Sequence, residues 1–305
     1  MRVKDMTGKT VVITGGSSGI GRETACALAC AGAQVVITSR HRERGDKAAA
    51  ALRSRTGNPR IHAVQMDLAD LTSVREGAAE ILARFERIDV LINNAGVLLG
   101  KRRMSADGIE ATFATNHLGH FALTHLLLER IVRSAPARII TVAARAHRAV
   151  HGSLDIDGLA SGAAYKGERA YAQSKLANIL FTRALSQRLA GTGVTANCVH
   201  PGVVATRIGA DDARLWRSIG RALTRPLKMS AWQGARTSIY LATSPRVANV
   251  SGRYFAHCRV VRPSGAAQDD AAAQHLWLVS ENLVRRLTAA SRSGRTQPAL
   301  ALAAT

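Results

Sequence analysis

The glycine-rich segment at 14–21, with the sequence TGGSSGIG, constrains the fold of this chain more than any other feature. It follows a short β-branched run at 10–14 that predicts a buried strand, and it precedes a helix-forming stretch at 22–31. Glycines let the backbone turn sharply and approach a pyrophosphate, whose charge rests on the N-terminus of the helix. A plain strand-to-helix turn is the alternative, but this context favours a dinucleotide site. Its predicted residues are Gly15, Ser17, Ser18, Gly19, Ile20 and Gly21.

Strands and helices alternate along most of the chain. The residue patterns predict strands at 34–38, 61–65, 90–92, 138–142, 194–199 and, at the sheet edge, 252–255. They predict helices at 46–55, 72–85, 111–133, 170–189 and 231–243. Such alternation is typical of an α/β fold. We predict a single Rossmann-type doubly wound parallel sheet with helices on both faces.

One domain of this kind accounts for most of the 305 residues. We expect residues 1–262 to form the cofactor-binding and catalytic Rossmann domain, and residues 263–290 to add a C-terminal helix packed on it. The last stretch, 291–305, is small, polar or rich in alanine, which predicts a disordered tail. The C-terminal helix is predicted at 270–287, with an apolar face made of Leu276, Val279, Leu283 and Leu287.

Composition limits the class of protein. No window of about 18 or more uninterrupted apolar residues occurs, so no transmembrane span is predicted. The polar, charged start at 1–9 lacks the apolar stretch of a secretory signal, and we expect a cytoplasmic protein. Cys26 and Cys30 lie one helical turn apart, and we interpret them as buried small side chains rather than metal ligands. The four cysteines show neither metal-site spacing nor a disulfide framework: Cys26, Cys30, Cys198 and Cys258.

The net charge of +21 comes mostly from arginines scattered along the whole chain. A nucleic-acid binder usually concentrates basic charge on one helix or strip and adds aromatic stacking groups. Aromatic residues make up only 4% here, so specific nucleic-acid binding is not predicted. The charge would draw anionic ligands, among them a phosphorylated cofactor, and gives at most a weak peripheral attraction to an anionic membrane.

The end of the second predicted strand bears on the choice of cofactor. An NAD-preferring dehydrogenase normally places an acidic residue there to accept ribose hydroxyls, whereas this chain has Arg40 within the sequence SRHR at 39–42. Arg22 follows the last glycine of the loop. A guanidinium suits a 2′-phosphate through its charge and paired donors, which favours NADP(H). The alternative is that both arginines are solvated surface residues.

Further polar residues follow the third and fourth predicted strands. Asp67, just after the third strand, is placed to hydrogen-bond an adenine edge, and Leu68 lies next to it in the predicted cofactor site. The sequence NNAG at 93–96 ends the fourth strand at the rim where ligands bind in such sheets. Amides there could lock neighbouring loops and line the adenosine pocket. A plain turn is the alternative for either feature alone. The predicted residues of this turn are Asn94, Ala95 and Gly96.

A tyrosine and a lysine open the predicted helix at 170–189, in the sequence YAQSK. Tyr171 and Lys175 lie four residues apart and hence on one face of the helix. A lysine ammonium near a phenol favours the phenolate, which draws the tyrosine pKa down from about 10 toward the working range of a general acid/base. Such a pair is common by chance, but behind the glycine loop and the NNAG turn it indicates a catalytic pair.

The order and spacing of these motifs resemble the short-chain dehydrogenase/reductase superfamily. The likeness covers about residues 7–287. Five segments resemble its retinol dehydrogenase-like branch: FATNHLGHF (113–121), SKLAN (174–178), VHPGVV (199–204), SGRYF (251–255) and HLW (275–277).

This resemblance implies roles for individual residues. Tyr171 would exchange a proton with the substrate oxygen, and Lys175 would hold the nicotinamide ribose and lower the tyrosine pKa. Asn116 would anchor a water in the proton relay. Hydride would pass between nicotinamide and a carbonyl or carbinol carbon. The nicotinamide end of the cofactor would be received by Pro201, Gly202, Val204 and Thr206.

One group that the resemblance implies is missing. A substrate-binding serine belongs near the end of the fifth strand, usually as the second of a Ser-Ser pair, and the matching positions hold Ala143 and Ala144. The loss of one such donor to the substrate oxygen costs about 2.7–4 kcal/mol, a rate factor of about 10² to 10³. Thr141 is a poor replacement, because it points to the opposite face of the strand. The candidates in the loop before Tyr171 are Ser153, Ser161, His147 and His151.

Two functions stay open. The first is an NADP-dependent oxidoreductase acting on a hydrophobic alcohol, aldehyde or ketone, and the retained Tyr171, Lys175 and Asn116 favour it. The second is an NADP(H)-binding protein with a non-redox catalytic role or a scaffold or sensor role, and Ala144 favours it. Substrate choice is expected to lie in 207–229, whose apolar stripe forms either a lid or ordinary packing. The resemblance also makes a homo-oligomer possible.

Overall fold

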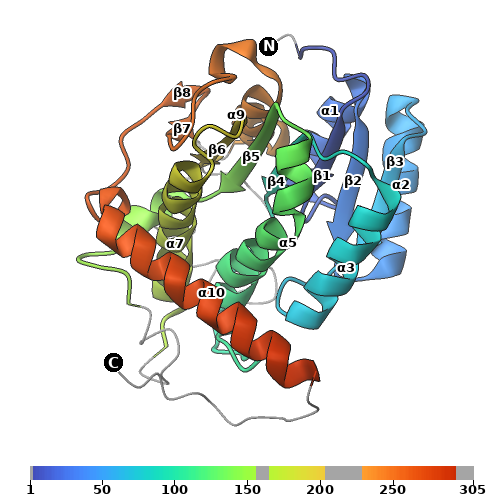
Figure 1. Ribbon diagram of the computed structural model, residues 1–305. Coiled ribbons are helices and arrows are strands. Elements are labelled where there is room, and N and C mark those ends of the chain that lie inside the picture. Colours follow the sequence, from blue (N-terminus) through green and yellow to red (C-terminus); the bar gives the residue numbers. More distant parts are fainter. Residues whose placement is uncertain (1–2, 156–164, 203–228, 293–305) are drawn as a thin grey trace.

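The computed structural model describes residues 3–155, 165–202 and 229–292. Its strands form one eight-stranded sheet in the order β3-β2-β1-β4-β5-β6-β7-β8, with every pair parallel except β7 and β8 (Figure 1). The predicted α/β fold with a doubly wound sheet is confirmed. The strands are β1 (Thr10–Ile13), β2 (Gln34–Ser39), β3 (Ile61–Gln65), β4 (Val90–Asn93), β5 (Ala137–Val142), β6 (Val194–Val199), β7 (Tyr254–Ala256) and β8 (Arg259–Val260).

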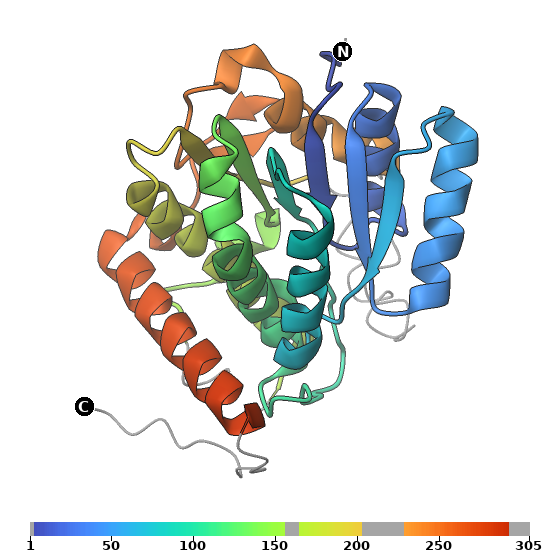
Figure 2. The same cartoon turned by 45° about the vertical axis from the view of Figure 1, so that its right-hand side comes forward.

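Helices cover both faces of the sheet (Figures 1 and 2). α1, α2 and α9 pack on one face, and α3, α5, α7 and α10 pack on the other. Along β1, Val11 and Ile13 pack in the hydrophobic core on the face of α1, α2 and α9. Val12 packs in the core on the opposite face, so the β-branched run is buried on both sides. Among the described helices, none is long and apolar enough to cross a membrane. The helices are α1 (Gly19–Cys30), α2 (Arg42–Thr56), α3 (Leu71–Arg84), α4 (Ala111–Phe113), α5 (Gly119–Arg133), α7 (Gly167–Arg188), α9 (Ala231–Thr243) and α10 (Asp270–Arg292).

One predicted helix differs from the observed backbone. The segment at 111–133 consists of α4, a wide π-helical turn at Ala114–Leu118, and α5. The side chain of Asn116, in this turn, is bound to the backbone of Val97 by two hydrogen bonds of 2.7 and 2.9 Å. These contacts join segments that are distant in sequence, so a helical residue pattern does not reveal the wide turn. Such turns are frequent at functional sites.

Three further details differ from the predictions. The predicted edge strand at 252–255 contains the start of β7, but β8 pairs with β7 and forms the edge of the described sheet. α10 continues to Arg292, into the predicted tail, and residues 293–305 lie outside the described part of the chain. Cys26 is buried but Cys30 is exposed, so the interpretation as a buried small side chain holds for Cys26 alone.

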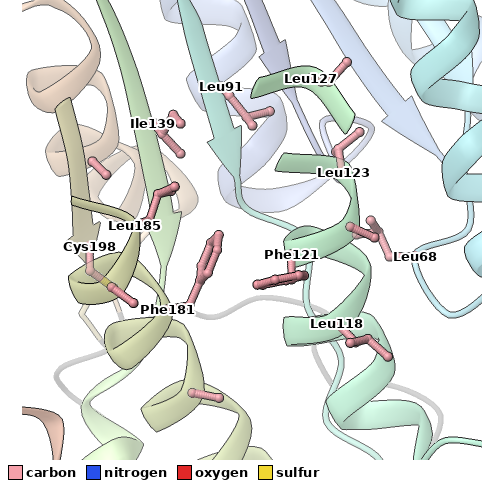
Figure 3. Packing of buried hydrophobic residues seen from close by; sticks show 14 of the residues in the cluster. Leu68, Leu91, Leu118, Phe121, Leu123, Leu127, Ile139, Phe181, Leu185 and Cys198 are labelled. Carbon is pink, nitrogen blue, oxygen red and sulfur yellow. The ribbon is translucent and has the colours of Figure 1, made fainter. Parts of the chain in front are cut away.

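The C-terminal helix α10 crosses the outside of α7 and α5 (Figure 1). All four residues of its predicted apolar face are buried or partly buried against the core. Trp277 lies edge-on to Phe121, with 4.9 Å between the ring centroids. Phe121 of α5 in turn faces Phe181 of α7 (Figure 3). The guanidinium of Arg188 lies 4.1 Å above the Trp277 ring, so aromatic and cation–π contacts join α10 to both helices.

Candidate functional site

The loops that follow β1 and β4 are held together at the point where the strand order reverses. The hydroxyl of Thr14 accepts hydrogen bonds from the backbone N–H groups of Asn94 (2.9 Å) and Ala95 (3.0 Å). The side-chain amide of Asn94 donates to the carbonyl of Thr14 at 2.8 Å. The glycine turn and the NNAG turn are therefore locked to each other at the sheet edge where open α/β folds bind ligands.

The glycine turn brings backbone close to backbone. Gly15 and Gly19 have φ angles of 65° and 53°, a region that side chains disfavour. A Cβ on Gly21 would lie 2.4 Å from the carbonyl oxygen of Gly15. Only glycine fits this tight turn, and its concave backbone suits the close approach of a pyrophosphate.

The N-terminus of α1 faces this turn with its donors available. In the described chain, the side chain of the N-cap residue Ser18 makes no capping hydrogen bond, and the first turn of α1 holds no acidic residue. Ser18 is exposed and Ser17 half-buried, whereas the side chain of Ile20 is buried in the core. Only the backbone of Ile20 can thus contribute to a ligand. Open N–H groups at the positive end of a helix fit the charge of a pyrophosphate.

Arg22 and Arg40 are the two arginines predicted to bind a 2′-phosphate. Arg40 directly follows β2 and is exposed. Arg22, in the first turn of α1, lies 3.6 Å from the carboxylate of Glu23, which Arg55 holds with two hydrogen bonds of 3.2 Å. Glu23 is nearly buried, but half of the Arg22 side chain is exposed and its 3.6 Å contact with Glu23 is longer than either bond from Arg55, so the guanidinium of Arg22 can turn to an anionic ligand.

Asp67 and Leu68 follow β3, toward the adenine end of the expected cofactor. The carboxylate of Asp67 is partly exposed and accepts a hydrogen bond from the N–H of Ala69 at 3.0 Å, which fixes its orientation. The side chain of Leu68 is buried in the core beside α5 (Figure 3). Leu68 can therefore line an adenine pocket through its backbone only.

Tyr171 and Lys175 lie near the start of α7. The ammonium of Lys175 lies 5.6 Å from the centre of the Tyr171 ring and donates to the carbonyl oxygen of Val142 at 3.1 Å. A Cβ on Gly96 would lie 3.3 Å from the Lys175 nitrogen and 3.3 Å from Oδ1 of Asn116. The catalytic helix, the end of β5, the π-helical turn and the NNAG turn thus converge on one place.

Burial sets the protonation of both groups. It raises the pKa of Tyr171 to about 12 and lowers the pKa of Lys175 to about 8. The predicted lowering of the tyrosine pKa is therefore wrong for this chain on its own. The ammonium lies over the aromatic ring and is bound to Val142, so its field does not outweigh the loss of solvent around the phenol.

Asn116 ties α7 to the NNAG turn. Its amide donates to the hydroxyl of Ser174 at 2.9 Å, and Ser174 donates to the carbonyl of Tyr171 at 2.8 Å. The other amide hydrogen and Oδ1 are bound to Val97. A water anchored by this residue must therefore bind its backbone carbonyl, which already accepts a hydrogen bond from His120 at 3.0 Å. His120 is not among the predicted site residues, although the segment FATNHLGHF contains it.

Ala144 lies just after β5, where the resemblance implies a serine, and is partly exposed. Its carbonyl accepts a hydrogen bond from Nδ1 of His147 at 2.8 Å, and Nε2 of His147 accepts one from the N–H of Ser264 at 3.1 Å. Because both nitrogens are bound to backbone, His147 does not replace the serine. The hydroxyl of Thr141 is buried, with no hydrogen-bond partner among the described residues. The candidates His151 and Ser153 are exposed, and Ser161 lies outside the described residues.

The expected nicotinamide end is described in part. Pro201 and Gly202 follow β6, and the N–H of Gly202 donates to Nδ1 of His200 at 3.1 Å. Gly202 has a φ of 83°, which lets the chain turn away from the strand. The remaining predicted residues, Val204, Thr206 and the segment 207–229 apart from Met229, lie outside the described residues.

Comparisons with known proteins agree with this arrangement. The short chain dehydrogenase family profile matches residues 9–214. Human retinol dehydrogenase 13 is 42% identical over 282 residues, which cover 91% of this chain and 85% of that protein. A crystal structure of a protein from Mycobacterium paratuberculosis is 34% identical, with a TM-score of 0.74, and the match covers 93% of this chain and 96% of that one. A short chain dehydrogenase from Burkholderia cenocepacia in complex with NADP is 27% identical, with a TM-score of 0.65, and the match covers 87% of this chain and 100% of that one. The chain belongs to the short-chain dehydrogenase/reductase family of oxidoreductases, in its retinol dehydrogenase-like branch.

Proposed function

We propose that this chain is an NADP(H)-dependent oxidoreductase acting on a hydrophobic alcohol, aldehyde or ketone. The observation that carries the proposal is the convergence of Tyr171, Lys175 and Asn116 beside a tight glycine turn. This turn leads into the N-terminus of α1, where the Ser18 side chain makes no capping bond, which fits a pyrophosphate. Bound NADP(H) would supply or accept the hydride. The name of the human relative, retinol dehydrogenase 13, supports an alcohol or its carbonyl counterpart as the substrate class.

The residues of the chain hold and move the proton. With a pKa of about 12, Tyr171 is protonated at working pH and can donate to a carbonyl oxygen. The ammonium of Lys175 stabilises the phenolate that this donation leaves behind. Asn116 and Ser174 fix the start of α7, which orients Tyr171. In this protonation state Tyr171 is ready to act as the proton donor in carbonyl reduction.

The direct test is NADPH consumption with a panel of aromatic and long-chain aldehydes, measured at 340 nm. Turnover with at least one class of aldehyde supports the proposal. Tight NADPH binding with no turnover on the whole panel would remove its oxidoreductase part. The second candidate, a cofactor-binding protein with a non-redox or sensor role, would then stand, and the alanine at Ala144 is the observation that favours it.

Arg40 is expected to select NADPH over NADH. Replacing it with alanine removes a charge-assisted contact to the 2′-phosphate, so Arg40→Ala should raise the Kd for NADPH by roughly 10- to 100-fold and leave the Kd for NADH nearly unchanged. Nucleotide fluorescence titration measures both constants. Arg133→Ala, at the far end of α5, is the control for a general loss of positive charge. Equal weakening of NADPH and NADH binding by Arg40→Ala would contradict the assignment.

Reduction is expected to slow as the pH rises above about 8. The pKa of Lys175 is lowered to about 8, so the ammonium that stabilises the tyrosinate is present below this pH and is lost above it. Tyr171 stays protonated on both sides of this transition. The pH profile of kcat/KM for an aldehyde measures the effect. Lys175→Arg keeps a charge at all these pH values and should be slower but lack the decline near pH 8. The same decline in that variant would assign it to another group.

A further inference from the structure

His120 lies at the start of α5, fully buried between the glycine turn and the catalytic side of the site. Its Nδ1 lies 3.0 Å from the backbone carbonyl oxygen of Asn116, and its Nε2 lies 2.8 Å from the hydroxyl of Thr14. The imidazole thus connects a residue beside the expected pyrophosphate to a residue that positions the catalytic helix. None of the roles predicted for the site residues involves His120.

The partners of the imidazole determine where its proton lies. A carbonyl oxygen only accepts, so Nδ1 carries the hydrogen and donates it to Asn116. Nε2 of the neutral ring is then an acceptor, and the hydroxyl of Thr14 donates to it. The carbonyl oxygen of Ile92 is a second possible acceptor for this hydroxyl, but it lies at 3.5 Å, whereas Nε2 lies at 2.8 Å. The oxygen of Thr14 already accepts from the N–H groups of Asn94 and Ala95, which agrees with a donated bond to His120. The hydrogen bonds therefore run in one direction, from the NNAG turn through Thr14 and His120 to Asn116.

The charge of the ring is fixed as well. Burial lowers the pKa of His120 to about 4, and the nearby Lys175 ammonium acts in the same direction. A protonated ring would point a second donor at a threonine oxygen that already accepts two hydrogen bonds. His120 is thus uncharged at working pH and does not act as a pH switch.

We propose that His120 is a positioning residue that couples the cofactor turn to Asn116 through this single tautomer. The inference rests on the proposed function in that it assumes a dinucleotide on the glycine turn. Cofactor contacts that order Thr14 and the NNAG turn would be transmitted through the ring to the Asn116 carbonyl, and Asn116 fixes α7 through Ser174. The affinity for NADPH and the alignment of Tyr171 depend on the same imidazole.

A neighbouring histidine provides the matched control. His117 is one turn earlier and also fully buried, and burial lowers its pKa to about 3. Its Nε2 lies 2.9 Å from the hydroxyl of Ser280 on α10, and its ring lies against Phe113. His117 therefore matches His120 in burial and in a polar contact at Nε2, but this contact is directed to the C-terminal helix and not to the cofactor turn.

The test compares His120→Phe with His117→Phe in the full chain. Thermal melting by circular dichroism measures stability, and fluorescence titration measures the Kd for NADPH. We expect both variants to lose stability, and only His120→Phe to raise the Kd, by roughly tenfold for one lost hydrogen-bonded link. Adding Thr14→Val to His120→Phe should raise the Kd by clearly less than the product of the two single effects, because both changes break the same chain. Equal effects of the two histidine variants on the Kd, or full additivity with Thr14→Val, would overturn the proposal.

A second measurement does not depend on the variants folding. In protein labelled with ¹⁵N-histidine, the His120 ring should show a protonated Nδ1 and a bare Nε2 that do not titrate near the ordinary histidine pKa of about 6.5. NADPH should shift these signals and leave those of His117 unchanged. The opposite tautomer, or a normal titration, would overturn the inference. Because neither measurement requires turnover, a chain that binds NADPH without reducing aldehydes would remove the proposed oxidoreductase activity and leave this coupling intact, whereas a chain that binds no NADPH would overturn both.

Discussion

Tyr171→Phe is expected to abolish NADPH-dependent aldehyde reduction and to leave NADPH binding near the wild-type level. The phenol is the proton donor at the substrate oxygen, and general acid catalysis of this kind contributes about 10² to 10⁴ in rate. Phenylalanine keeps the ring, which lies 5.6 Å from the Lys175 ammonium, so the packing of α7 should persist. Single-turnover NADPH oxidation measures the chemical step, and fluorescence titration measures the Kd.

Tyr165 offers a matched control for this variant. Burial also raises its pKa to about 12, and its hydroxyl lies 3.1 Å from the carbonyl oxygen of Leu99 and 3.2 Å from the carboxylate of Glu110. These contacts join the segment before α7 to Leu99 and Glu110, and neither involves Lys175 or Asn116. Tyr165→Phe should therefore keep most of the activity. If it removed activity as completely as Tyr171→Phe does, the loss would reflect damage to α7 and not the absence of a proton donor.

The regular part of the fold follows from local patterns in the sequence. The β-branched runs that became β1 and β2 are buried on both faces, and this burial is what a continuous apolar run predicts. The π-helical turn at Ala114–Leu118 could not be predicted in this way. In this turn, two hydrogen bonds join Asn116 to the backbone of Val97, and helical periodicity carries no information about contacts with another loop.

The site was predictable as a set of residues but not in its electrostatics. Tyr171 and Lys175 lie on one helix face at the expected sheet edge, because spacing on a helix fixes their relation. Their pKa values depend on how far the surrounding elements exclude water, and the sequence does not show that exclusion. The role of His120 was hidden for a similar reason. A histidine in an apolar helix looks like a core residue until Thr14 and the Asn116 carbonyl are placed at its two nitrogens.

Ala144→Ser is expected to increase the rate of aldehyde reduction by about tenfold or more, toward the factor of about 10² to 10³ that a donor to a developing oxyanion supplies. The carbonyl of Ala144 is fixed by His147, so a new hydroxyl would project from a defined backbone position after β5. Ala144 is also partly exposed, which leaves the added oxygen room without a burial penalty. Steady-state kcat/KM with the best aldehyde of the panel measures the gain.

Ala143→Ser is the control, and it separates a positioned hydroxyl from any added hydroxyl. Ala143 is 1% exposed and belongs to the core, so its serine variant should lose about 1–3 kcal/mol of stability and gain no activity. If the wild-type chain already reduces aldehydes and Ala144→Ser accelerates it, the natural enzyme works with one donor fewer than the family resemblance implies. If the wild-type chain binds NADPH but only Ala144→Ser turns over, the same scaffold has been converted from reduction to another use. If Ala144→Ser gives no gain, whether or not the wild-type chain is active, the substrate oxygen does not approach Ala144. A correctly placed hydroxyl at that position would increase the rate.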